Sequence, residues 1–192
     1  MTVDGLRRMV AELRGSLRDA EDLLRQAEAF DQQQRRKKMT VSFPDELLRQ
    51  IAADGERCYP EEACGLVFGK DGRATEVAVM PNVYARYAKL DPERFPRSNR
   101  NAYKMDELKV MNLVDAAAKR GETLVAIYHS HPDVGSYFSA EDKAVAMGDG
   151  GTPIWPGAEY FVLAVNQKKA EVAKSFHWDG KDFVGREIAL PR

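Results

Sequence analysis

The chain has 192 residues, enough for one ordinary domain with a helix or two added and too few for two large domains that share a cleft. Its 29 basic and 30 acidic side chains leave a net charge of −1, so neither nucleic acid nor a membrane is expected as a partner. Two cysteines in a chain of this length exclude a disulfide scaffold and a cysteine-based zinc module. The longest apolar stretch, Tyr160 to Val165, is far shorter than the roughly 20 residues that span a bilayer, and the charged N-terminus is unlike a signal peptide. We therefore expect a cytoplasmic protein.

The first 38 residues have a pattern of their own. Their apolar positions recur in alternating steps of four and three, the spacing of a helical heptad seam: Leu6, Val10, Leu13, Leu17, Ala20, Leu24 and Ala27. A polar, basic run over residues 31–38 then predicts a solvated linker. We divide the chain into a helical arm with its linker, residues 1–38, and a domain over residues 39–192. The helix over residues 1–30 is expected to form a weak homodimer or to dock on the body of the protein, and the pattern does not rank the two.

From residue 39 onward, helix and strand signals alternate without a repeat period, which predicts a mixed α/β domain. In chain order, the predicted elements are a strand over 41–43, a helix from Pro44 to the Tyr59–Pro60 pair, strands over 65–68 and 75–80 joined by a hairpin turn, a loop over 91–101, a helix from about 106 to 121, a strand over 124–128, a helix over 139–147, a strand over 160–165 and closing strands up to 188.

Two of the three histidines in the chain, His129 and His131, are separated by a single residue and follow a predicted strand. We expect the chain to turn past the end of this strand and to bring the two imidazoles together there. Ser139 is the expected N-cap of the next helix, which places Asp142 in its first turn, facing the end of the strand. Two imidazoles and one carboxylate are the usual three protein ligands of a catalytic zinc that keeps its fourth position for water.

An open zinc site also needs a base that is not a ligand, to accept the proton of that water and pass it to the leaving amine. Glu62 is the favoured candidate, but its neighbour Glu61 is not separated from it by the residues alone. Ser139 is an N-cap on any interpretation. Cys64, next to an apolar strand, is interpreted as a small core residue rather than as a nucleophile or a fourth ligand.

Together these motifs resemble the JAMM, or MPN+ (Mov34/PAD-1), zinc metallopeptidases, in particular the prokaryotic type that acts on sulfur-carrier or ubiquitin-like proteins. The resemblance extends over roughly residues 40–190 and rests on the two histidines, the Ser-x-x-Asp sequence at 139–142 and the segment over 60–66. In that family the upstream glutamate stands three residues before a glycine, as Glu62 stands before Gly65, which selects Glu62. The implied fold is the MPN/JAB-like one, a central mixed β-sheet flanked by helices.

The resemblance implies one zinc ion per chain, held by His129, His131 and Asp142. It implies that Glu62 activates the water and that the Ser139 hydroxyl donates a hydrogen bond to the developing oxyanion. Ser130, between the histidines, is similar to the peptidase branch of the family, whereas its DNA-repair-associated relatives tend to carry asparagine there.

The implied activity is hydrolysis of the bond after the C-terminal Gly-Gly of a ubiquitin-like or sulfur-carrier protein, with release of the attached amine. We expect the extended tail to lie along an exposed strand edge, where glycines permit close approach of the backbone. The alternatives are a non-catalytic scaffold that binds a ubiquitin-like partner, with structural zinc, and hydrolysis of a small molecule. The motif leaves open whether the amine belongs to lysine, a peptide or free cysteine.

Three further features have simpler interpretations. His177 is expected to be an ordinary strand histidine away from the metal. Tyr137 and Trp155 are expected either to line the substrate rim or to pack within their loops. The glycine-rich segment over 148–153 lacks the following Lys-Ser/Thr of a phosphate loop and is interpreted as a simple loop or flap.

Overall fold

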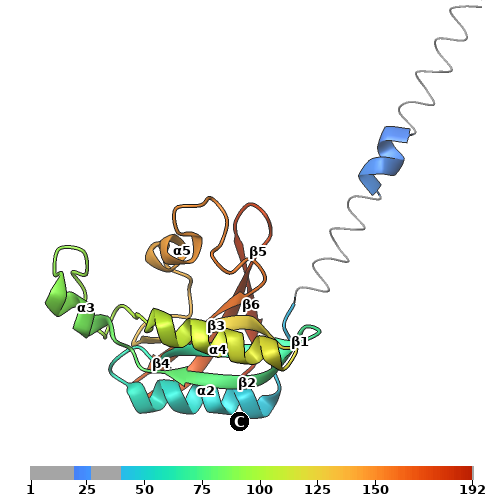
Figure 1. Ribbon diagram of the computed structural model, residues 1–192. Helices are drawn as coiled ribbons and strands as arrows, with labels where there is room; N and C mark the ends of the chain where they lie inside the picture. Colours follow the sequence, from blue (N-terminus) through green and yellow to red (C-terminus); the bar gives the residue numbers. More distant parts are fainter. Residues whose placement is uncertain (1–19, 27–39, 192) are drawn as a thin grey trace, which may run out of the picture. The chain divides into compact units, whose positions relative to one another are not determined.

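The computed structural model describes residues 20–26 and 40–191, and the two ranges are treated separately (Figure 1). Residues 20–26 are helical. The rest of the predicted arm and the basic run over 31–38 lie outside the described residues, so the heptad seam, its dimerisation or docking and the boundary at 38 remain predictions. None of the helices in the described ranges combines the length and the hydropathy that crossing a bilayer requires.

The domain is built on one six-stranded mixed sheet, which confirms the predicted fold class. Its strands are β1 (Cys64–Lys70), β2 (Arg73–Met80), β3 (Thr123–Pro132), β4 (Glu159–Asn166), β5 (Lys169–Trp178) and β6 (Phe183–Ile188). They lie in the order β2-β1-β3-β4-β5-β6, with β3 and β4 parallel and the other neighbours antiparallel. The helices after residue 40 are α2 (Asp45–Cys58), α3 (Tyr84–Leu90), α4 (Glu107–Lys119) and α5 (Ala140–Met147).

Helices cover both faces of the sheet. On one face, Leu48 and Ile51 of α2 belong to the same core cluster as Leu163 of β4 (Figure 1). The other face carries a second cluster that includes Ala117 of α4 and Ala146 of α5. Because both faces are covered, the central strands are buried along almost their whole length instead of alternating with exposed positions.

The central strand β3 is longer than the sequence predicted. It does not end at residue 128 but continues to Pro132, and its parallel register with β4 places His131 opposite Ala164. The expected turn before the histidines is therefore wrong. Because side chains two residues apart in a strand point to the same face, His129 and His131 project together from a regular strand.

Two further predictions differ from the structure near the edges of the domain. The predicted strand over 41–43 is only an isolated bridge between Ser42 and Arg73, because the N–H of Val41 is bound by the side chain of Glu159 instead of a neighbouring strand. The helix α3 was not predicted. It is a single short element anchored by Tyr84, whose ring packs edge-on against Phe95 in the following loop, and such a contact leaves no periodic signal in the sequence.

Gly65, three residues after Glu62, has a packing role. A Cβ there would lie 2.4 Å from Cε1 of Tyr128 and 2.5 Å from the carbonyl oxygen of Ala78. The ring of Tyr128 thus passes over Gly65, and its hydroxyl donates to Oδ2 of the buried Asp54 on α2 at 2.8 Å. The glycine allows the residue directly before His129 to be fixed to α2.

The buried carboxylate of Glu159 in β4 connects the first residues of the domain to strands β5 and β6. It is 2% exposed at the start of β4, and it accepts hydrogen bonds from the N–H of Val41 (2.7 Å), from the hydroxyl of Ser175 and from the guanidinium of Arg186 (3.0 Å). A buried charge is tolerated in a protein when it is paired and hydrogen-bonded in this way.

We expect Glu159→Ala to lower the free energy of unfolding by about 3–5 kcal/mol, because it leaves buried donors unpaired and Arg186 without its counter-charge. The matched control is Glu187→Ala, since Glu187 is 82% exposed and lies 3.9 Å from Lys174; this variant should lose less than about 1 kcal/mol. Urea denaturation followed by circular dichroism measures both values, and equal losses would contradict the role given to Glu159.

Candidate metal centre

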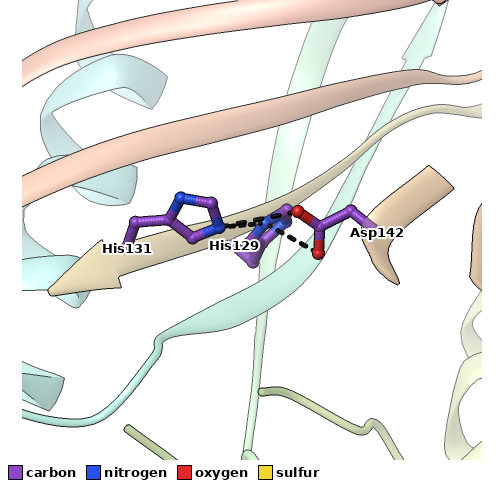
Figure 2. Close-up of side chains that lie close together, drawn as sticks. All are labelled: His129, His131 and Asp142. Atoms are coloured by element: carbon purple, nitrogen blue, oxygen red, sulfur yellow. Dashed lines mark hydrogen bonds and ion pairs between the residues drawn. The ribbon is translucent and has the colours of Figure 1, made fainter. Parts of the chain in front are cut away.

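Three side chains converge at the end of β3 and the start of α5 (Figure 2). The Nε2 atoms of His129 and His131 lie 3.1 Å apart. Asp142 places Oδ1 3.4 Å from Nε2 of His129 and Oδ2 3.6 Å from Nε2 of His131. In the part of the chain that the structure describes, these three residues form the one group of His, Cys, Asp or Glu side chains arranged to hold a metal ion.

The spacing of the two ring nitrogens and the Asp142 oxygens fits a metal ion. Bonds of about 2.0–2.2 Å, as zinc makes with imidazole and carboxylate, separate the ligand atoms of a tetrahedral site by roughly 3.3–3.6 Å. The two Nε2 atoms lie 3.1 Å apart, and they lie 3.4 and 3.6 Å from Oδ1 and Oδ2 of Asp142, respectively, which is close to that range. The predicted ligands His129, His131 and Asp142 are thus brought together in a geometry suited to binding.

Burial and the contacts among the three side chains shift their pKa values. Burial lowers the pKa of His129 and so favours its neutral form, which is the form that binds metals. Burial also acts to raise the pKa of Asp142, but hydrogen bonding to the two histidines outweighs it and holds that pKa well below its usual range. For His131, the opposing effect of burial is outweighed by the Asp142 hydrogen bond and the charge of Glu62, so its pKa is raised. A proton and a metal ion therefore compete for His131.

Neighbouring groups fix the orientation of the two rings. Nδ1 of His131 lies 3.1 Å from the carbonyl oxygen of Gly135, which makes it the donor and leaves Nε2 free to bind a metal. The ring of Tyr103 stacks on His129 with centroids 4.6 Å apart. The ring of Tyr137, expected either to line the substrate rim or to pack within its loop, lies against the ring of His131 with centroids 5.1 Å apart, and Tyr137 lines the hollow.

Ser139 is the N-cap of α5, as predicted. Its Oγ accepts a hydrogen bond from the N–H of Asp142 at 3.0 Å, and its own N–H donates to Oδ2 of Asp142 at 2.9 Å, forming a capping box. The hydroxyl also donates to Oδ2 at 2.7 Å. The cap therefore fixes the same carboxylate that faces the histidines, while the oxyanion role of Ser139 stays a prediction.

Glu62 lies two residues before β1 and is 5% exposed, facing the same hollow as His131 and Asp142. Burial raises its pKa to about 8; Asp142 adds to this rise, and the positive charges of His131 and Arg97 oppose it. A divalent cation in the triad would oppose it further. Glu61, by contrast, is exposed and accepts a hydrogen bond from Asn99 outside this hollow, so the structure separates the two candidates.

The hollow beside the triad has a volume of about 440 Å³, within the usual range for a binding pocket. One of its walls is the loop that follows α3, which contributes Arg94, Arg97 and Arg100. Arg97 forms an ion pair with Glu141 of α5 and so joins this loop to the helix that carries Asp142. The sequence predicted a loop over residues 91–101 but did not place it at the site, because only the tertiary contacts bring it there.

The remaining candidate residues lie in surroundings that suit a structural role. Cys64 is fully buried in the core, its pKa raised by burial, which suits a core residue and not a nucleophile. Ser130 points to the opposite face of β3 from the histidines, and its Oγ accepts the N–H of Ala63 at 2.8 Å. Trp155 packs against the core instead of lining the hollow, and His177 lies on β5 outside the triad.

We expect one divalent metal ion per chain, tested with zinc, and a loss of at least about tenfold in affinity for His131→Ala and Asp142→Asn. A ligand that binds only the folded state at a thousandfold excess over its Kd adds about 4 kcal/mol to the free energy of unfolding, so chelation should lower the Tm measurably. His177→Ala removes the third histidine and is the control, with metal content unchanged. Full metal content in the two ligand variants, measured by elemental analysis, would show that the triad is not the site.

Comparison with known proteins agrees with this geometry. Residues 44–179 match the Prok-JAB family, described as prokaryotic homologs of the JAB domain. A protein of Haloferax volcanii named desampylase is 28% identical over 133 residues, which cover 68% of this chain and 78% of the relative.

Two solved structures share the fold at low sequence identity. A protein of Desulfitobacterium hafniense has a TM-score of 0.59 at 22% identity, covering 79% of this chain and 93% of that one. A protein of Salinibacter ruber has a TM-score of 0.51 at 24% identity, covering 79% and 92%. Since the family match extends over well more than half of the chain and includes the triad and Glu62, the chain belongs to the prokaryotic JAB-domain family, the JAMM/MPN group that its motifs indicated.

Proposed function

We propose that this chain is a zinc-dependent peptidase or isopeptidase that hydrolyses the bond after the C-terminal Gly-Gly of a ubiquitin-like or sulfur-carrier protein and releases the attached amine. The observation that carries the proposal is that the buried Glu62 faces the same hollow as His131 and Asp142, two members of a triad arranged to hold a metal ion. The similarity to a protein named desampylase supports a hydrolase that acts on a ubiquitin-like modifier.

The donor set favours zinc. His129, His131 and Asp142 supply two nitrogens and one oxygen, and three protein ligands leave a fourth position free, as in catalytic zinc sites. Zinc, when bound, would lower the pKa of a water molecule towards neutrality and polarise the scissile carbonyl. The chain's own contribution is to hold the three ligands from a central strand and a capped helix, so that they do not rearrange during the reaction.

Glu62 is proposed as the general base and acid. It accepts the proton of the attacking water and delivers it to the amine that leaves. Its pKa, raised by burial to about 8, lies close to neutral pH, where a group can both take up and release a proton efficiently.

Ser139 is proposed to stabilise the oxyanion. Its hydroxyl turns from Asp142 Oδ2, where it donates at 2.7 Å, towards the oxygen on which negative charge develops. Its position at the N-terminus of α5 favours negative charge there, because the helix dipole presents its positive end.

The substrate tail is proposed to lie along an exposed strand edge. The edge strand β2 ends beside the site, since its last residue, Met80, pairs with Cys64 two residues after Glu62. A tail paired with this edge enters the hollow as an extended chain. The cytoplasmic location expected from the sequence is retained as part of the proposal.

Glu62→Gln should lower kcat by about 10²–10⁴-fold, the usual contribution of general acid–base catalysis, while one zinc ion per chain is kept. The neighbouring Glu61→Gln is the control and should stay within about twofold of wild type, because Glu61 is exposed and outside the hollow. Turnover of a carrier–amine conjugate, with elemental analysis of zinc, measures both. Normal turnover by Glu62→Gln would refute the assignment of the base.

Replacing the last glycine of the carrier with valine should abolish cleavage, because a branched Cβ obstructs the close approach of the tail backbone to the triad. The control is a conjugate whose substitution lies well upstream of the tail, in the folded part of the carrier. Undiminished cleavage of the valine conjugate would show that Gly-Gly is not what the site recognises.

The scaffold alternative is tested by the same assay. A scaffold binds the carrier with or without the metal and releases no amine, whereas the proposed enzyme loses turnover on chelation and regains it when zinc is restored. The complete triad together with the buried Glu62 favours the enzyme.

A further inference from the structure

The side-chain amide of Asn82, just after β2, is bonded to four backbone groups. Nδ2 donates to the carbonyl oxygens of Glu62 (3.1 Å) and Ala102 (3.0 Å). Oδ1 accepts the N–H groups of Tyr84 (3.1 Å) and Lys104 (3.2 Å). The two donors and two acceptors of the amide are thereby all used, and the reverse orientation would face donors with donors. One side chain joins the segment before β1, the start of α3 and the loop before α4.

This amide is part of the support of Glu62. The residue lies outside β1, so no neighbouring strand binds its main chain. Its carbonyl is held by Asn82, and its N–H donates to the carbonyl oxygen of Asn99 at 2.7 Å. Asn99 is in turn tied to α3, because its Oδ1 accepts the N–H of Ala85 at 2.8 Å. Both polar groups of the Glu62 backbone therefore depend on the segment over 82–104.

The same loop also touches the metal centre. Tyr103, between the two loop residues that Asn82 binds, stacks on His129. A displacement of this loop therefore shifts the wall of the hollow and the backbone of Glu62 together, while the backbone of the three candidate metal ligands stays supported by β3 and α5.

We propose that Asn82 is a positioning residue, which sets the main chain of Glu62 and the Tyr103 wall at the distance from the triad that proton transfer requires. This inference rests on the proposed function, because it assigns Glu62 the role of base. A general base must be within hydrogen-bonding distance of the proton it removes, and a misplacement of about 1 Å costs on the order of 100-fold in rate.

The kinetic test uses Asn82→Asp and Asn82→Ala in the full chain. Aspartate keeps the shape but turns an acceptor towards the carbonyls of Glu62 and Ala102, whereas alanine only removes the bonds. Both variants should keep one zinc ion per chain, lower kcat at least about tenfold and change KM for a carrier–amine conjugate less than about threefold, with the larger loss in Asn82→Asp. The matched control is Asn166→Asp, which removes a hydrogen bond from the end of β4 to Glu171 of β5 and should leave both constants within about twofold.

A second measurement is independent of turnover. In Asn82→Ala, hydrogen–deuterium exchange at the amides of Tyr84, Lys104 and Glu62 should accelerate at least about tenfold. The first two amides lose their acceptor, and the segment of Glu62 loses the hydrogen bond that Asn82 donates to the Glu62 carbonyl oxygen. Exchange at Val162 in the buried strand β4 should not change.

The outcomes separate this inference from the proposed function. Three results would each overturn the positioning role. They are an unchanged kcat in both folded variants, unchanged exchange at the three amides, and a loss of kcat that is fully explained by lost zinc or by unfolding. A chain that fails to fold with either substitution counts as unfolding. If wild-type protein hydrolyses no conjugate, the proposed function is wrong, and the exchange data alone then decide whether Asn82 holds the Glu62 segment.

Discussion

The pairing of β3 with β4 through Pro132 is the constraint on which the metal centre depends. A strand bonded on both sides cannot rotate its side chains from one face to the other, so the two-residue repeat of β3 holds His129 and His131 towards the same point. Behind them, Tyr128 crosses Gly65 to reach Asp54 on α2, which fixes the strand on its other face. The ligand geometry is therefore a property of the centre of the sheet and not of a loop.

The burial of Asp142 and Glu62 determines the electrostatics of the hollow. Asp142 is held ionised by its two histidines, whereas Glu62 has less compensation and its pKa rises to about 8. Two carboxyl groups in one poorly solvated hollow disfavour each other's charge, and a divalent cation relieves this strain. Ionisation of Glu62 and the binding of a cation by the triad would thus be coupled.

Rigidity is distributed unevenly around the reaction centre. The candidate metal ligands belong to regular elements, but the main chain of Glu62 is held by the side-chain amide of Asn82 and by the backbone carbonyl of Asn99, which reach between segments with no common ladder. The arginine-bearing loop over 91–101 is linked to α5 through Arg97 and Glu141. The parts that differ most in local support are Glu62 and the pocket wall, and both line the hollow beside the triad.

Local sequence patterns predicted most of the regular elements and the three side chains that the structure brings together as candidate ligands. The apolar runs predicted the sheet, and Ser139 with Asp142 predicted a capped helix, because both signals arise within a few residues. Only the tertiary structure showed that β3 extends through the histidines, that α3 forms against Phe95 and that Asn82 reaches Glu62. It also separated Glu62 from Glu61 by burial, a choice that the residues alone left open and only the family resemblance made. Pairing, burial and cross-segment hydrogen bonds depend on residues far apart in the chain, and no local pattern encodes their partners.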